Sequence, residues 1–180
     1  MCTGLRPASS PFTPYGPDPC PATAYSLPVE AGPYVVGTRR YEWVDTARNR
    51  KVPVRVWYPA KAKTGAPVTY LFLLKSTALE NAAPDDADGP YPLVLFSHGF
   101  RGAAEQSFSI TEHVASWGYF VAAPDHVTNT LMDFNASDQQ SAEVAAERPV
   151  DMKYALDRVS GNGAKYELAE LVDSSATAVM

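Results

Sequence analysis

The fold is decided by residues 91–100, which read YPLVLFSHGF. The apolar run Leu93–Phe96 predicts a buried strand, and the polar turn Ser97–Phe100 ends that strand abruptly. We expect Gly99 to permit a sharp backbone turn where a side chain would not fit. A helical pattern follows at residues 106–117, and then comes a second apolar strand. This stretch therefore predicts a strand, a crossover helix and a parallel strand.

The chain before this stretch predicts an antiparallel hairpin. Residues 38–44 form its first strand, and Val52–Tyr58 alternates in the way typical of a strand with one buried face. Pro53 indicates a free edge or a bulge nearby. A long connection follows at residues 59–90, in which Val68–Leu79 is either a short helix or an extended apolar flap. The connection either shapes a substrate pocket or packs as a surface insertion.

Two helices are predicted after residue 100. The first covers residues 106–117 and ends at Gly118. Its apolar stripe at helical spacing, which we expect to be buried, comprises Ile110, Val114 and Trp117. The second covers Pro149–Val159 and begins with a proline suited to the first turn. We expect Arg148 to reach Asp151 across that turn and to anchor the helix.

The order of these elements predicts an α/β fold. An N-terminal antiparallel hairpin is followed by parallel strands, with crossover helices on both faces of the sheet. Residues 1–33 hold 8 of the 16 prolines and predict an extended arm, so the domain is expected at residues 34–180. The last strand, residues 176–180, would be a bare sheet edge. Bare apolar edges pair with other chains, so we expect self-association.

The amino-acid composition favours a globular protein and gives no support for binding to nucleic acid. The chain is 46% hydrophobic and 19% charged, which suits a globular protein. A net charge of −5 gives no electrostatic reason to expect a nucleic-acid partner. Basic residues do gather at two places, and we expect a solvated hairpin edge and turn there rather than a partner site; they are Arg39, Arg40, Arg48, Arg50 and Lys51.

Targeting and cysteine signals are sparse. No apolar run approaches the ~18 residues of a membrane span. No signal peptide is visible either, although a processed N-terminus would leave a secreted or periplasmic location open. Cys2 and Cys20 are either an unrelated pair or a disulfide.

Candidate chemistry lies at the ends of two neighbouring predicted strands. His98, Gly99 and Phe100 follow one strand, and His126 closes the next. Ligands of such sheets bind outside these carboxyl ends, and a Phe100 N–H without a strand partner can donate to an oxyanion. The alternative is a tight strand exit in which His98 bonds to the loop. The histidines at 98, 113 and 126 lack ligand-type spacing, so we expect no metal site.

Four separated stretches resemble the platelet-activating factor acetylhydrolase and dienelactone hydrolase-like branch of the α/β hydrolases. They are YPLVLFSHG at 91–99, ASWGYFVAAPDH at 115–126, RPVDMKYALD at 148–157 and DSSATAVM at 173–180. The opening hairpin fits as well, so the resemblance covers about residues 32–180. It implies a truncated α/β-hydrolase fold.

The resemblance also implies an activity. Phe100 would supply one oxyanion-hole amide, and His98 and Gly99 would shape its loop. No Gly-x-Ser-x-Gly occurs in the 180 residues, so the second amide and the catalytic triad are expected after Met180.

The implied protein is the N-terminal portion of a serine carboxylic-ester hydrolase that needs no cofactor and is inactive alone. Its substrate would be a small ester, such as a phospholipid acyl ester, a lactone or a polyester. The alternative functions are a non-catalytic binding module or one half of a two-chain enzyme.

Overall fold

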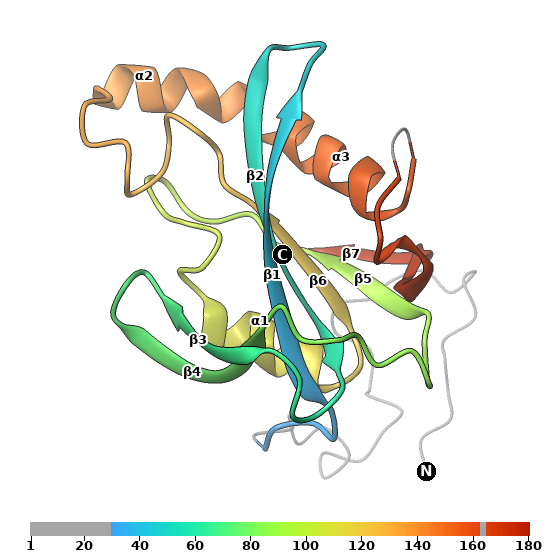
Figure 1. Cartoon of the computed structure of the whole chain (residues 1–180). Coiled ribbons are helices and arrows are strands. Elements are labelled where there is room, and N and C mark those ends of the chain that lie inside the picture. Colours follow the sequence, from blue (N-terminus) through green and yellow to red (C-terminus); the bar gives the residue numbers. More distant parts are fainter. Residues whose placement is uncertain (1–29, 163–164) are drawn as a thin grey trace, which may run out of the picture. The chain divides into compact units, whose positions relative to one another are not determined.

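A computed structural model describes residues 30–162 and 165–180 of the chain. The proline-rich arm predicted at residues 1–33 lies outside the described residues up to position 29, as do Cys2 and Cys20. The described chain builds one seven-stranded sheet in the order β3-β4-β1-β2-β6-β5-β7 (Figure 1). Among these residues, none of the helices has the length and apolarity needed to cross a bilayer.

The strands are β1 (Val35–Asp45), β2 (Arg50–Ala60), β3 (Ala66–Tyr70), β4 (Leu74–Glu80), β5 (Tyr91–Leu95), β6 (Phe120–Pro124) and β7 (Val172–Val179). The helices are α1 (Phe108–Ser116), α2 (Asp138–Glu143) and α3 (Arg148–Val159), with the short 3-10 helices η2 (Val144–Ala146) and η3 (Ala169–Leu171).

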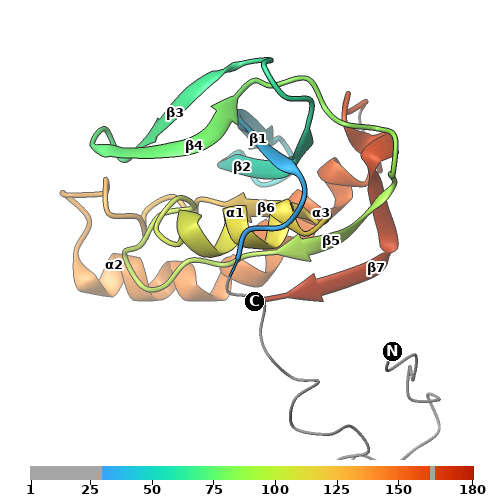
Figure 2. The ribbon, with the colours of Figure 1, turned by 90° about the horizontal axis from the view of Figure 1, so that it is seen from below.

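The topology is that of the predicted α/β fold. Strands β1 and β2 form an antiparallel hairpin, whereas β5 is parallel to both β6 and β7. The chain crosses from β5 through α1 to β6, and then from β6 through α3 to β7 on the other side of β5. The view from below shows β7 at one end of the sheet and the β3–β4 hairpin at the other (Figure 2).

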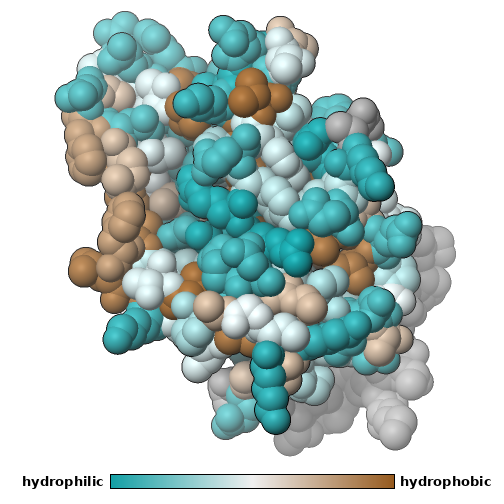
Figure 3. Space-filling model, viewed as in Figure 1, coloured by the Kyte–Doolittle hydropathy of each residue, from teal (hydrophilic) through white to brown (hydrophobic). Residues whose placement is uncertain are grey.

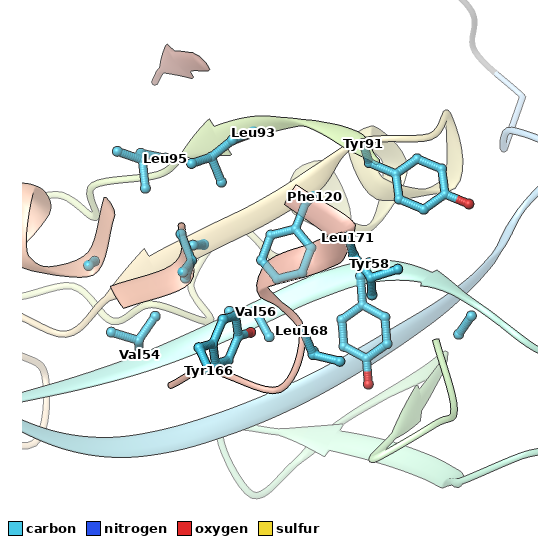
Figure 4. Packing of buried hydrophobic residues seen from close by; sticks show 14 of the residues in the cluster. Val54, Val56, Tyr58, Tyr91, Leu93, Leu95, Phe120, Tyr166, Leu168 and Leu171 are labelled. Carbon is cyan, nitrogen blue, oxygen red and sulfur yellow. The ribbon is translucent and has the colours of Figure 1, made fainter. Parts of the chain in front are cut away.

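Two apolar layers hold the helices to opposite faces of the sheet. One layer joins Val54 and Val56 of β2 to Phe120 of β6 and to Ala155 and other residues of α3 (Figure 4). The other layer comprises Trp57, Val94, Val121 and Ala115, among others. Because neighbouring strand residues point to opposite faces, β2 contributes to both layers.

Strand β2 is therefore buried on both faces, and the predicted single buried face is wrong. It lies between β1 and β6, so it is not an edge strand, and its pairing with β1 has no bulge. Pro53 is tolerated because it lies level with the end of β6. Its carbonyl accepts a hydrogen bond from Asp125 N at 2.8 Å. The N–H that proline lacks would point in the same direction, towards the chain just beyond the end of β6, so the β2–β6 pairing loses no hydrogen bond.

The long connection at residues 59–90 contains the β3–β4 hairpin and no helix. Strand β4 pairs with β1 in parallel through Gly37 and Leu79, so the hairpin extends the sheet. Its turn places Leu71 and Phe72 at φ values of 47° and 66°, a region that side chains seldom occupy. The extended alternative for this segment is therefore the one observed.

Helix α1 buries only part of the predicted stripe, because Val114 is the one residue of the three that packs against the core. Ile110 and Trp117 are 54% and 43% exposed, whereas Thr111, Ala115 and Ser116 are buried. These small residues let the helix approach the sheet closely, and bulky ones there would not fit. The prediction followed hydrophobicity and was wrong for Ile110 and Trp117, two of its three residues. Gly118, with φ of 87°, ends the helix region as expected.

Replacing Ala115 by Leu is expected to lower the free energy of unfolding of the chain by about 1–3 kcal/mol, because the added methylenes overpack the contact with the sheet. The matched change Ile110→Ser on the exposed side should alter it by less than about 0.5 kcal/mol. Chemical denaturation of both variants measures the difference. A larger cost for Ile110→Ser would restore the stripe predicted from the sequence.

Candidate active site

The loop that leaves β5 lies at the carboxyl end of the parallel strands, beside the end of β6. Ser97 N donates to the carbonyl of Met180 at 2.9 Å, so this loop starts next to the end of β7. Phe100 is 57% exposed, and no group among the described residues accepts a hydrogen bond from its N–H. The loop therefore presents an unpaired donor at the end of the sheet where ligands of such folds bind.

The turn in this loop does not depend on Gly99 in the way predicted. A Cβ on Gly99 would meet only Gln106 Nε2, at 3.7 Å, which is an ordinary contact. A Cβ on Gly102 would instead displace the Gln106 amide and lie 3.1 Å from the Gly99 carbonyl. Arg101 has a φ of 52°, and its N–H donates to Asn129 Oδ1 at 2.8 Å. The chain reverses in a turn with Phe100 and Arg101 at its centre, which is closed by the Gly102 N–H donating to the Gly99 carbonyl at 3.0 Å. The steric reason given for Gly99 is therefore wrong.

His98 is fully buried beneath the loop. Its Nδ1 lies 2.8 Å from the carbonyl of Gly99, and its Nε2 accepts a hydrogen bond from the backbone N–H of His126 at 3.0 Å. These partners require a neutral ring with the proton on Nδ1. Burial is the main cause that lowers the pKa of His98, to about 4. His98 thus joins the end of β5 to the end of β6.

A chain of hydrogen bonds runs from Ser97 to a buried carboxylate. His126 Nε2 lies 3.1 Å from Ser97 Oγ, and its Nδ1 lies 3.1 Å from Asp151 Oδ2. Arg50 binds both oxygens of Asp151 at 2.9 Å, and Arg48 Nη1 binds Oδ1 at 2.9 Å. Burial alone would raise the pKa of Asp151, but the hydrogen bonds from His126 and the two arginines outweigh it and lower the pKa to about 2.

Two expectations about charged residues are therefore wrong. Arg48 and Arg50 are not solvated turn residues, because they pair with a fully buried carboxylate. Arg148 does not bond Asp151 across the first turn of α3. Its Nη2 instead donates to Ser97 Oγ at 3.0 Å and to the carbonyl of His98. No local signal in the sequence pairs residues 48–50 with residue 151, because the contact exists only after the sheet and α3 have packed.

A cavity of about 460 Å³ lies beside the loop. Its floor carries the ion pairs Arg40–Asp125, at 3.0 Å, and Arg55–Glu105, at 2.6 Å. Its apolar lining comes from the β3–β4 turn and from the loops after β5 and β6, through Leu71, Phe72, Ala103 and Met132. Figure 3 shows apolar surface along the margin where Figure 1 places this turn and these loops. The 59–90 connection thus forms one wall of the cavity.

Comparison with known proteins identifies the family. A family model described as chlorophyllase matches residues 74–173. The chain belongs to the chlorophyllase family. A solved ferulic acid esterase from Streptomyces cinnamoneus is similar over 81% of this chain and 51% of that chain, with 26% sequence identity and a TM-score of 0.63. The chain therefore spans about half the length of that esterase. No sequence among curated proteins matches the chain.

These findings confirm the α/β-hydrolase superfamily and the fold predicted from the sequence motifs. The acetylhydrolase and dienelactone hydrolase-like branch remains a prediction, and so do the roles of Phe100, His98 and Gly99. Within the described residues, no group of three or more His, Cys, Asp or Glu side chains is placed to hold a metal ion.

The stability of the chain is expected to fall as the pH drops from about 6.5 to about 4. Between these pH values His98 is protonated in the unfolded chain but stays neutral in the folded chain, where it is buried. The unfolded state therefore binds more protons, and a lower pH favours it. The loss should reach at most about 3 kcal/mol. His98→Gln, which keeps an acceptor for His126 N–H but does not titrate, should flatten the slope. Denaturation midpoints across this pH range measure the effect.

The titration of Asp151 does not contribute to the stability change expected between pH 6.5 and pH 4. Its pKa lies below the ordinary value of 3.8, so the stability that it contributes is lost only as the pH falls from 3.8 towards 2. An equal slope between pH 6.5 and 4 in wild type and His98→Gln would show that His98 is not the titrating group.

Proposed function

We propose that this chain is the N-terminal portion of a serine carboxylic-ester hydrolase, to which it supplies one donor of the oxyanion hole. Membership of the family and the similarity to a solved esterase support the reaction class. The observation that carries the proposal is the unpaired N–H of Phe100, an exposed residue in the loop at the carboxyl end of the parallel strands. A donor in this position suits the charge that develops on a carbonyl oxygen under attack.

The proposed reaction is acyl transfer through a serine. A serine hydroxyl attacks the ester carbonyl, the alcohol leaves, and water then releases the acyl group. Phe100 N–H would stabilise the tetrahedral oxyanion in both steps. We place the nucleophile beyond Met180. Met180 N bonds Leu95 O and Met180 O bonds Ser97 N, each at 2.9 Å, so a continuing chain would leave the sheet next to the loop.

The proposed substrate is a small ester. A phospholipid acyl ester, a lactone and a polyester all fit the reaction class, and similarity to the ferulic acid esterase adds esters of ferulic acid. The cavity beside the loop supports an ester with an apolar part, because its apolar lining includes side chains such as Phe72 and Met132.

The first test uses the coding sequence that follows residue 180. The proposal requires a Gly-x-Ser-x-Gly within a few residues of Met180. The chain extended by that coding sequence should hydrolyse 4-nitrophenyl acetate, whereas the 180-residue chain alone should not, since loss of the nucleophile costs on the order of 10⁶ in rate. A missing motif, or robust turnover by the lone chain, contradicts the proposal.

The second test removes only the donor. In the extended chain, replacing Phe100 by phenyllactic acid turns its amide N–H into an ester oxygen and should lower kcat by about 10²–10³-fold. Phe100→Leu keeps the N–H and should retain kcat within a few-fold, which makes it the matched control. Equal kcat values for these two variants would remove Phe100 from the oxyanion hole.

A second candidate is one half of a two-chain enzyme or a binding module. The outer edge of β7 favours it, because β7 is the last strand in the described sheet and residues 174–179 are exposed. Such an edge can pair with a second copy or with another chain. Ester hydrolysis that appears only when a separate C-terminal partner is added would establish the two-chain form.

We expect the 180-residue chain to self-associate through β7. Ala176→Lys places a charge on this exposed strand and should shift the chain towards monomer in sedimentation velocity. Ser109→Lys, an equal charge on exposed α1, should leave association unchanged. A wild-type chain that sediments as a monomer at every concentration tested would exclude pairing through this edge.

A further inference from the structure

Ser97, His126 and Asp151 are ordered like a nucleophile, a base and an acid. Ser97 Oγ meets His126 Nε2, and His126 Nδ1 meets Asp151 Oδ2, each at 3.1 Å. They come from three separate elements, namely the loop after β5, the loop after β6 and the first turn of α3. None of them belongs to the triad that the proposed function expects beyond Met180.

The surroundings of these three residues favour a structural role for them over nucleophilic attack by Ser97. Asp151 is already neutralised by two guanidinium groups, so little of its charge remains to stabilise a protonated His126. Arg148 donates to Ser97 Oγ at 3.0 Å, and a hydrogen bond from a cation lowers the nucleophilicity of that oxygen. His126 and Asp151 are both fully buried.

We propose that His126 and Arg148 are positioning residues for the oxyanion loop. This inference rests on the proposed function. Together they fix the two residues that precede Gly99 and Phe100. His126 accepts from Ser97 O–H and donates its backbone N–H to His98, while Arg148 donates to Ser97 Oγ and to the His98 carbonyl. The segment that presents Phe100 N–H is thereby tied to β6 and to α3.

Asp151 determines which atoms of His126 and Ser97 donate hydrogen bonds and which accept them. Its ionised carboxylate accepts the Nδ1 proton of His126, which leaves Nε2 as an acceptor. Ser97 O–H must therefore point at His126, and its oxygen is free to accept from Arg148. The carboxylate in turn is held by Arg48 from the β1–β2 turn and by Arg50 from the start of β2. With the His126 ring neutral, a single arrangement of protons satisfies the whole group.

The kinetic test uses the extended chain, with rates normalised by active-site titration. Ser97→Ala and Arg148→Met should each lower kcat by about 10–100-fold, because a displaced donor is felt in the transition state. KM should stay within about threefold. Ser97→Thr and Arg148→Lys, which keep a hydroxyl and a cation, should recover most of the loss. Ser109→Ala, on the exposed face of α1, is the control.

A double substitution tests whether the effect passes through Phe100. If Ser97 acts by placing Phe100 N–H, Ser97→Ala should lower kcat little further when Phe100 is replaced by phenyllactic acid. Fully multiplicative effects would overturn the inference. So would a large effect of phenyllactic acid together with unchanged kcat in Ser97→Ala and Arg148→Met. An inactive extended chain, or no effect of phenyllactic acid, would instead reject the proposed function.

Two measurements on the 180-residue chain do not need activity. Imidazole nitrogen shifts at neutral pH should show the proton on Nδ1 of both His98 and His126. A His126 ring protonated on Nε2 would contradict the inference, whatever the kinetics of the variants. A fluorophosphonate probe should leave Ser97 unlabelled by mass spectrometry. Labelling at Ser97 that is lost in Ser97→Ala would show a nucleophile and overturn the supporting role.

Discussion

The buried carboxylate of Asp151 is the constraint on which the rest of the site depends. An ionised carboxylate without partners in this position would cost several kcal/mol. Its partners are Arg48 from the β1–β2 turn, Arg50 from the start of β2, and His126 from the loop after β6. The hairpin, the central strands and the start of α3 must therefore meet at one point. This meeting fixes α3 along the sheet and brings Arg148, its first residue, within reach of Ser97.

The end of β6 serves both faces of the sheet. Asp125 and His126 are adjacent, and neighbouring residues of an extended chain point to opposite sides. Asp125 accepts from Arg40 at 3.0 Å and from Ala104 N at 2.7 Å, on the side of the cavity. His126 bonds Ser97 and Asp151 on the side of α3. One dipeptide thus connects the lining of the cavity with the hydrogen bonds that hold the loop after β5.

The sequence predicted most of the frame and little of this network. The β1–β2 hairpin, β5, β6 and α3 follow from local periodicity, and Gly118 follows from its conformational freedom. The buried face of α1 does not, because close packing selected Ala115 over the larger Ile110. The partners of Arg48 and Arg50 lie about a hundred positions away in the chain. Pairings at that separation leave no periodic trace, so a single sequence contains no signal for them.

The hydrogen bonds to Ser97 and His98 also fix the position of the Phe100 N–H. A donor stabilises a transition state best when it is fixed before the reaction begins, because no energy is then spent on reorganising it. The bonds that fix Ser97 and His98 all lie within the described residues, and they join the loop to His126, Arg148 and Met180. The shape of the loop therefore does not require a nucleophile to be in place. Buried polar groups that are paired with one another thus hold the loop in one shape, and the proposed role of Phe100 as an oxyanion donor would require such a fixed shape.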